Sequence, residues 1–150
     1  ELLESVGRDS QARGQYDVLA AQQQLYAAQG SVDDLAASQV AADHGNPAQA
    51  LRAAQQEWTR HQNVFSADAL AWALHVNGRD SDALAYADKA AALGWRNATF
   101  AYHRGMILAS LGRAADARAV LSQALVINPH FSPLAAPRAR QTLAELGGPR

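Results

Sequence analysis

Apolar residues recur at helical spacing over residues 98–131, the clearest pattern in the chain. The first half of this stretch places Phe100 and Leu108 on one helical face and stops at Gly112. Glycine readily takes the left-handed conformation found just past a helix end. The second half is apolar at the same spacing and stops before Pro129, because proline disfavours helical geometry in the residue that precedes it. The stretch therefore predicts two helices joined by one turn.

Weaker versions of the same pattern fill the rest of the chain. The predicted turn glycines are separated by 31, 33 and 34 residues, and they are Gly14, Gly45, Gly78 and Gly112. Two such short helices cannot bury their apolar faces alone, so repeated units of this size are expected to stack on one another. The predicted units span residues 1–30, 31–63, 64–97 and 98–131, and a more polar capping helix covers about 133–146. We expect a single all-α domain.

Several of the predicted helices begin at residues that favour helix starts. Asn46 is followed by Pro47, which suits the first helical position because its missing N–H would be unpaired there in any case. Asn97, Ser31 and Ser66 precede other apolar runs, and their side chains can accept a hydrogen bond from a free backbone N–H. These residues are the predicted caps.

Composition supports an all-helical chain and excludes some classes of partner. The 150 residues include 35 alanines, the best helix former, and no cysteine, so disulfide and thiol chemistry are absent. Thirteen basic against 14 acidic residues give a net charge of −1, which argues against a nucleic-acid binder. No apolar run has the length of a membrane span. Lys89 is the single lysine, and this bias together with the alanine excess indicates a GC-rich bacterial genome.

In the spacing of its turn glycines and in its predicted helix pairs, the chain resembles the tetratricopeptide-repeat family, whose period is 34 residues. The resemblance covers about residues 1–131 and is strongest in the last two units. The family favours small residues at its eighth, fifteenth, twentieth and twenty-seventh positions, and proline at its thirty-second. The matching residues include Ser38, Ala71 and Gly105 at the eighth position, the turn glycines at the fifteenth, Ala50, Ala83 and Ala117 at the twentieth, Ala90 and Ala124 at the twenty-seventh, and Pro129 at the thirty-second. Gly7 fills the eighth position of the first unit. The resemblance implies a right-handed α-solenoid of stacked antiparallel helix pairs, closed by the capping helix.

In this family the first helix of each pair lines a concave groove that binds partner segments. Carried over by position, the groove residues are Val32, Leu35, Ala36, Gln39, Ala42 and Asp43 in the second unit, Phe65, Asp68, Ala69, Trp72, His75 and Val76 in the third, and Thr99, Tyr102, His103, Met106, Ala109 and Ser110 in the fourth. From these we select as partner-binding residues Gln39, Asp43, Asp68, Trp72, His75, Tyr102, His103 and Met106. Aromatic side chains and methionine on a rigid wall are typical of binding hot spots. The alternative is that Trp72 and Tyr102 simply fill gaps between alanine-rich helices.

The chemistry of these positions narrows the expected partner. The listed positions of the second to fourth units hold no lysine, arginine or asparagine, so the carboxylate clamp of chaperone-binding family members is not expected. Asp43 and Asp68 make the groove neutral to mildly acidic, which favours an apolar or mildly basic protein segment. The five histidines lack paired metal-ligand spacing, so we predict no metal and no cofactor.

These observations predict an interaction scaffold rather than an enzyme. No glycine-rich phosphate loop and no nucleophile elbow occur in the sequence. The alternatives are a structural or self-assembling module, a homo-oligomer among them, and a regulatory domain of a larger protein. The chain begins at Glu1, which suggests a fragment or a processed product. We favour a cytoplasmic location, and an exported form with a removed leader stays open.

Overall fold

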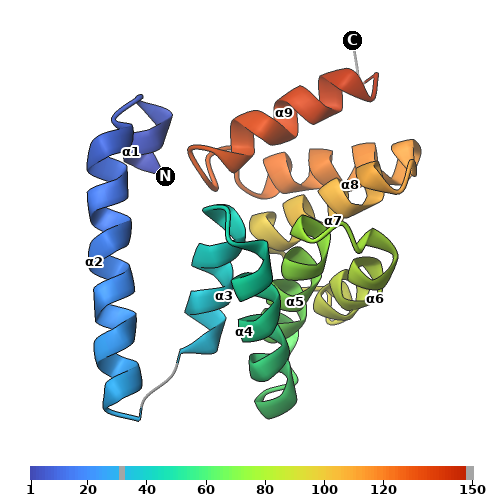
Figure 1. Cartoon of the computed structure of the whole chain (residues 1–150). Coiled ribbons are helices and arrows are strands. Elements are labelled where there is room, and N and C mark those ends of the chain that lie inside the picture. The colour runs from blue at the N-terminus through green and yellow to red at the C-terminus, as the bar shows by residue number, and fades with distance from the viewer. Residues whose placement is uncertain (31–32, 148–150) are drawn as a thin grey trace.

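The computed structural model describes residues 1–30 and 33–147, and all regular structure in those ranges is α-helical (Figure 1). The helices are α1 (Leu2–Ser5), α2 (Asp9–Ala28), α3 (Asp34–Asp43), α4 (Pro47–Arg60), α5 (Val64–Val76), α6 (Asp80–Ala91), α7 (Ala98–Ser110), α8 (Ala114–Ile127) and α9 (Ala135–Glu145). The predicted all-α class is therefore confirmed.

Most of the helices pack in sequential pairs. Helix α3 packs against α4, α5 against α6 and α7 against α8, with antiparallel-like contacts (Figure 1). The first members of the pairs also touch one another, α3 on α5 and α5 on α7. This arrangement is consistent with a helical repeat, and it sets α3, α5 and α7 side by side.

Turns and caps explain why the pairs begin and end where they do. Gly78 and Gly112 have φ angles of 73° each, in the left-handed region, as the predicted turns require. Asn97 accepts hydrogen bonds from two backbone N–H groups at the start of α7, and Asn46 accepts one at the start of α4, ahead of Pro47. These predicted helix starts are confirmed.

Two other predicted starts differ. Helix α5 begins three residues earlier than predicted, because Asn63 is its cap and Ser66 completes a capping box from the N3 position. The predicted cap Ser31 lies outside the described residues. The start of α3 is capped by Asp33, whose carboxylate accepts from the N–H of Ala36 at 3.0 Å.

The core is built mainly from alanines on facing helices. Ala50, Ala71, Ala83 and Ala117 are fully buried. Small side chains at these positions let paired helices approach closely. Gly105 lies at another close helix contact, since a Cβ placed there would lie 2.6 Å from Cγ and Cδ2 of Leu121. The predicted close helix contact at Gly105 is confirmed.

The first predicted pair is not formed as expected. Gly14 was predicted to end a helix, but it lies inside the 20-residue helix α2. A helical glycine costs only about 1 kcal/mol relative to alanine, and neighbours such as Ala12 and Gln15 are good helix formers. The chain turns instead at Gly7, whose φ is 72°. Gly7 therefore ends the four-residue helix α1, and it does not form the helix contact that its repeat position implied.

Helix α2 stands apart from the pairs, at the left of Figure 1. In the described part of the chain, α1 is the helix that packs against it, and Ala12 is the single buried residue of α2. Its connection to the other helices runs through Tyr16, whose ring lies 3.8 Å from that of His44 and whose hydroxyl donates to Glu4 at 2.7 Å. A second link joins Ser132 Oγ to the carboxylate of Glu1 at 3.1 Å.

Helix α9 closes the other end of the array, across the top of Figure 1. It packs on α8 and on α7. Ala136 and Ala139 are buried, while Arg138 and Gln141 lie on its polar side. A helix with one small apolar face and one polar face suits the end of a stack, as predicted for residues 133–146.

Candidate functional site

Helices α3, α5 and α7 enclose a hollow of about 220 Å³. Its lining residues are Gln39, Ala42 and Asp43 from α3, Ala69 and Trp72 from α5, and Thr99 and His103 from α7. Each of them occupies a position that the repeat resemblance implied for the concave groove. Half of the selected partner-binding residues, Gln39, Asp43, Trp72 and His103, are thereby brought together.

Trp72 forms one wall of the hollow and is held on several sides. Its ring stacks on His103, with centroids 4.2 Å apart and planes 13° apart, and on His75 at 4.8 Å. Its indole N–H donates to Oδ1 of Asp43 at 2.8 Å. Only 9% of the residue is exposed. Most of Trp72 therefore packs between helices, as the gap-filling alternative proposed, and only a small part of its surface is open to a ligand.

His103 is fixed from behind by a buried carboxylate. Its Nδ1 lies 2.9 Å from Oδ2 of Asp68, which is 2% exposed. Because a carboxylate oxygen accepts, Nδ1 of His103 is the donor in this pair. The second oxygen of Asp68 has no hydrogen-bond partner among the described residues. Asp68 was expected to face the groove, but its burial makes it a support for His103.

His75 has a local partner at the adjoining turn. Its Nδ1 lies 2.5 Å from Oδ1 of Asp80, the first residue of α6. It does not line the hollow, although its ring contacts Trp72. His75 is therefore a neighbour of Trp72 that is anchored to the start of α6.

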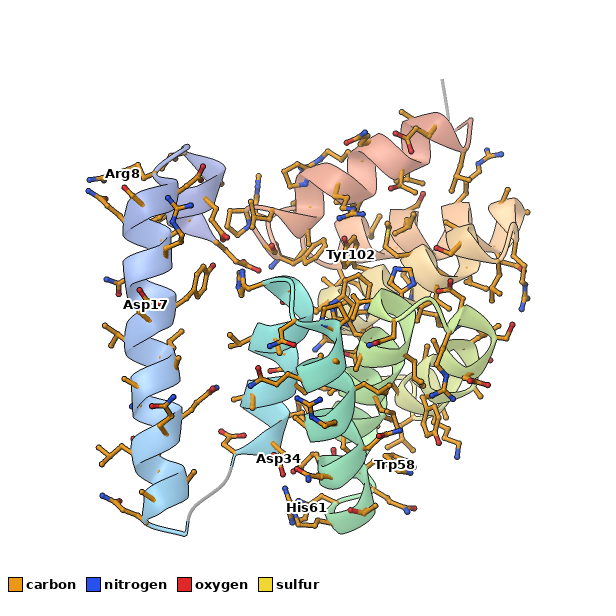
Figure 2. The ribbon with its side chains drawn as sticks, viewed as in Figure 1. Arg8, Asp17, Asp34, Trp58, His61 and Tyr102 are labelled. Atoms are coloured by element: carbon orange, nitrogen blue, oxygen red, sulfur yellow. The ribbon has the colours of Figure 1, made fainter. Side chains whose placement is uncertain are left out.

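Tyr102 and Met106 lie on the part of α7 that faces α9. Tyr102 is 3% exposed, and Figure 2 shows it beneath α9, where its ring approaches Phe131 at 5.5 Å. Burial raises the pKa of its hydroxyl, the charge of Arg138 acts in the opposite direction, and Asp43 adds to the rise. Met106 Sδ lies 3.6 Å from the hydroxyl of Thr142. Both side chains are too buried to form a large contact surface for a partner.

A second, larger hollow of about 710 Å³ is lined by residues of α7 and α9. Its lining residues are Met106, Ala109 and Ser110 from α7, and Leu134, Pro137, Arg138, Gln141, Thr142, Glu145 and Leu146 from α9 and its ends. The sequence reasoning treated α9 as a cover and missed this contribution. The spacing of Leu134, Arg138, Gln141 and Glu145 at four, three and four residues was the available signal, because residues so spaced share one helical face.

The first hollow offers several polar groups beside an aromatic wall. Asp43 contributes a carboxylate, Gln39 an amide, and Thr99 a hydroxyl, and all three residues are exposed. His103 contributes an imidazole. In the described ranges, no group of three or more histidine, aspartate or glutamate side chains is arranged to hold a metal ion. Nor is any described helix both long and apolar enough to cross a membrane.

Sequence comparison identifies no relative of this chain. The chain matches no known family model, and no curated protein is significantly similar to it. What the described residues establish is an all-helical protein of nine helices, most of them packed in sequential pairs, with a hollow along the first helices.

Proposed function

We propose that this chain is a protein-interaction scaffold of the tetratricopeptide-repeat type, which binds an extended partner segment along α3, α5 and α7 without catalysing a reaction. The observation that carries the proposal is the hollow of about 220 Å³. Its seven lining residues come from three helices that are separated in sequence, and all of them occupy expected groove positions. Side-by-side first helices that share one recessed surface are the feature that such scaffolds use for binding.

The larger hollow beside α9 extends the proposed binding surface. A segment that crosses the first hollow can continue past Met106 toward Arg138 and Glu145, which carry opposite charges. The proposed partner is therefore apolar or mildly basic where it meets Asp43, with mixed polarity toward α9. This chemistry does not resemble a carboxylate clamp.

The test requires a variant that blocks the hollow without disturbing the core. Trp72→Ala is unsuitable, because removing a side chain that is 91% buried would cost about 3–5 kcal/mol of folding free energy. Thr99 is exposed at the rim, so Thr99→Arg places a bulky cation in the hollow at little folding cost. Gln56→Arg makes the matched charge change at an exposed position of α4 outside both hollows.

The experiment is a selection from a display library of short random peptides. We expect the wild type and Gln56→Arg to enrich the same peptides and Thr99→Arg to lose them, while all three melt at similar temperatures. Enrichment of the same peptides by Thr99→Arg would reject the concave surface as the binding site. Failure of the wild type to enrich any sequence would reject peptide binding.

A second candidate function, self-assembly, is favoured by the surface of α2. Val18 and Leu25 are 62% and 57% exposed, and they lie seven residues apart on one helical face. Residues 18–30 contain no charged side chain. A neutral surface can meet its own copy without like-charge repulsion, and among the described residues the helix that packs on α2 is the four-residue helix α1. On this view, two α2 helices from two copies pack against each other.

Concentration-dependent mass measurement tests this second function. We expect a dimer that Leu25→Glu dissociates, whereas Leu93→Glu, at an 80% exposed position beyond α6, leaves it intact. Because the chain has no cysteine, Ala21→Cys gives a single crosslinking site at the middle of the proposed contact. A monomer at all concentrations, or a dimer that Ala21→Cys fails to crosslink, would reject association through α2.

A further inference from the structure

We propose that the hollow between α3, α5 and α7 is a recognition site for one arginine side chain of the bound segment. The proposal rests on the binding function above and specifies the ligand group at its centre. It follows from the inventory of polar groups at the hollow, from the state of Asp43, and from the confined wall that Trp72 forms.

The polar groups at the hollow call for a ligand rich in hydrogen-bond donors. The carboxylate of Asp43 only accepts hydrogen bonds, and the imidazole of His103 is already paired with Asp68 through Nδ1. Gln39 and Thr99 can also accept, through an amide oxygen and a hydroxyl oxygen. A guanidinium carries five N–H donors and no acceptor, so it satisfies such a set more fully than the three donors of a lysine ammonium.

The charge at the hollow also favours a cationic ligand. Asp43 is the exposed charged residue among the lining set, and only its Oδ1 is engaged, by the indole of Trp72. No hydrogen bond reaches Oδ2 of Asp43 from the described residues. The other nearby carboxylate, Asp68, is buried behind His103. Arg138 lines the neighbouring hollow and not this one, so no arginine or lysine of the lining set competes for Asp43.

Hydration favours a guanidinium over an ammonium at this hollow. The rings of Trp72 and His103 stack on each other and are 9% and 7% exposed, so the wall that they form has little free ring surface. A guanidinium is less strongly hydrated than an ammonium, so it loses less by entering such a confined site. The volume of about 220 Å³ equals the share of about seven liquid waters, which accommodates a guanidinium with its neighbouring methylenes.

The test uses a small probe and does not require a known partner. The protein has three tryptophans, so its NMR spectrum contains three indole N–H signals, and Trp72→Phe identifies the one that belongs to Trp72. Wild-type protein is titrated with N-acetyl-arginine amide and, separately, with N-acetyl-citrulline amide. Citrulline has nearly the shape of arginine but carries no charge.

We expect the arginine probe to shift the Trp72 indole signal in a saturable way, while the signals of Trp58 and Trp95 stay in place. The citrulline probe should bind about tenfold more weakly, since a hydrogen bond to a charged group is stronger than a neutral one. Asp43→Asn should weaken arginine binding to the same extent, because asparagine keeps an acceptor for the indole N–H but removes the charge. Asp17→Asn, on the outlying helix α2 in Figure 2, is the matched control and should change nothing.

Two results would overturn the arginine site. Equal shifts with the arginine and citrulline probes would show that charge is not recognised. Shifts spread over all three indole signals would show nonspecific binding. Either result together with Thr99-dependent peptide enrichment would refute the arginine site and leave the scaffold function standing. A specific arginine response without any peptide enrichment would support the arginine site and refute the binding of an extended segment.

Discussion

Adding one methyl group at Gly105 should destabilise this protein, although alanine is the better helix former. The new Cβ would lie 2.6 Å from Cγ and Cδ2 of Leu121 and 3.3 Å from its backbone nitrogen. Favourable carbon contacts lie at about 3.5–4.0 Å, so the two helices must separate by about 1 Å or Leu121 must leave its position. Leu121 is fully buried, which leaves it little room to move.

The expected magnitude is a difference between two opposing effects. Overpacking of this kind costs about 1–3 kcal/mol. Replacing a helical glycine with alanine stabilises the helix by about 1 kcal/mol. Gly105→Ala should therefore lower the free energy of unfolding by about 1 kcal/mol, which corresponds to about 2–4 °C in melting temperature for a chain of this length. Gly105→Leu, which adds a whole side chain to the same contact, should cost more.

Gly14 provides the matched control for helix propensity. It also lies within a helix, but a Cβ placed there would meet nothing within 4 Å. Gly14→Ala should therefore leave the melting temperature unchanged or raise it. Thermal unfolding followed by circular dichroism compares the two variants directly. If Gly105→Ala stabilises the protein as much as Gly14→Ala does, the close contact with Leu121 is refuted.

A double-mutant cycle then assigns the effect to the contact itself. Leu121→Ala alone should cost about 2–5 kcal/mol, because it leaves a cavity. In the double variant the new methyl group of residue 105 enters that cavity, so the combined loss should be smaller than the sum of the single losses. Strict additivity in urea unfolding would mean that the two residues do not touch.

Three further predictions follow from other contacts. Deleting residues 132–150 removes α9, which packs on α7 and α8, so the truncated chain should melt earlier and aggregate, as light scattering would detect; an unchanged monomer would contradict the capping role. Asp68→Ala should cost about 1–3 kcal/mol in urea unfolding, because it leaves the N–H of His103 unpaired, and Asp68→Asn should cost less because it keeps an acceptor. Tyr16→Phe should raise the pKa of Glu4 toward its usual value, since the hydrogen bond from Tyr16 is the main cause of its lowered pKa. The stabilisation from that bond is present above about pH 4.5 and lost as pH falls through the lowered pKa, which carboxyl NMR titration can follow, and an unchanged Glu4 titration would contradict it.

The sequence predicted best the features that depend on local chemistry. Gly78, Gly112 and Asn97 act at turns and helix starts within a few residues of their own position, so their residue types nearly specify the backbone. Gly14 shows the limit of this approach. A glycine permits a turn but does not require one, and nothing near it supplies the competing cap or proline that would end α2.

Burial of the candidate site was harder to predict than its position. Helical spacing places Asp68, Trp72 and His103 on the inner faces of α5 and α7, and the structure brings them together as expected. Spacing does not say how closely the neighbouring helix approaches. Asp68 pairs with a histidine that is 35 residues away in the sequence. Whether the two side chains meet depends on the small residues packed between their helices. For that reason the expected surface residues Asp68, Tyr102 and Met106 proved to be buried.

Close packing along the first helices also determines which residues are left for recognition. Alanines and Gly105 draw the helices together until the aromatic side chains are almost enclosed, so Trp72 and Tyr102 contribute mainly to folding. What stays accessible around the first hollow is its polar rim, formed by Asp43, Gln39 and Thr99. A large apolar anchor from a partner would find little room there, whereas one charged side chain could enter. Selectivity in the proposed scaffold should therefore depend on a few charged and hydrogen-bonded contacts, held in place by the packed aromatic side chains.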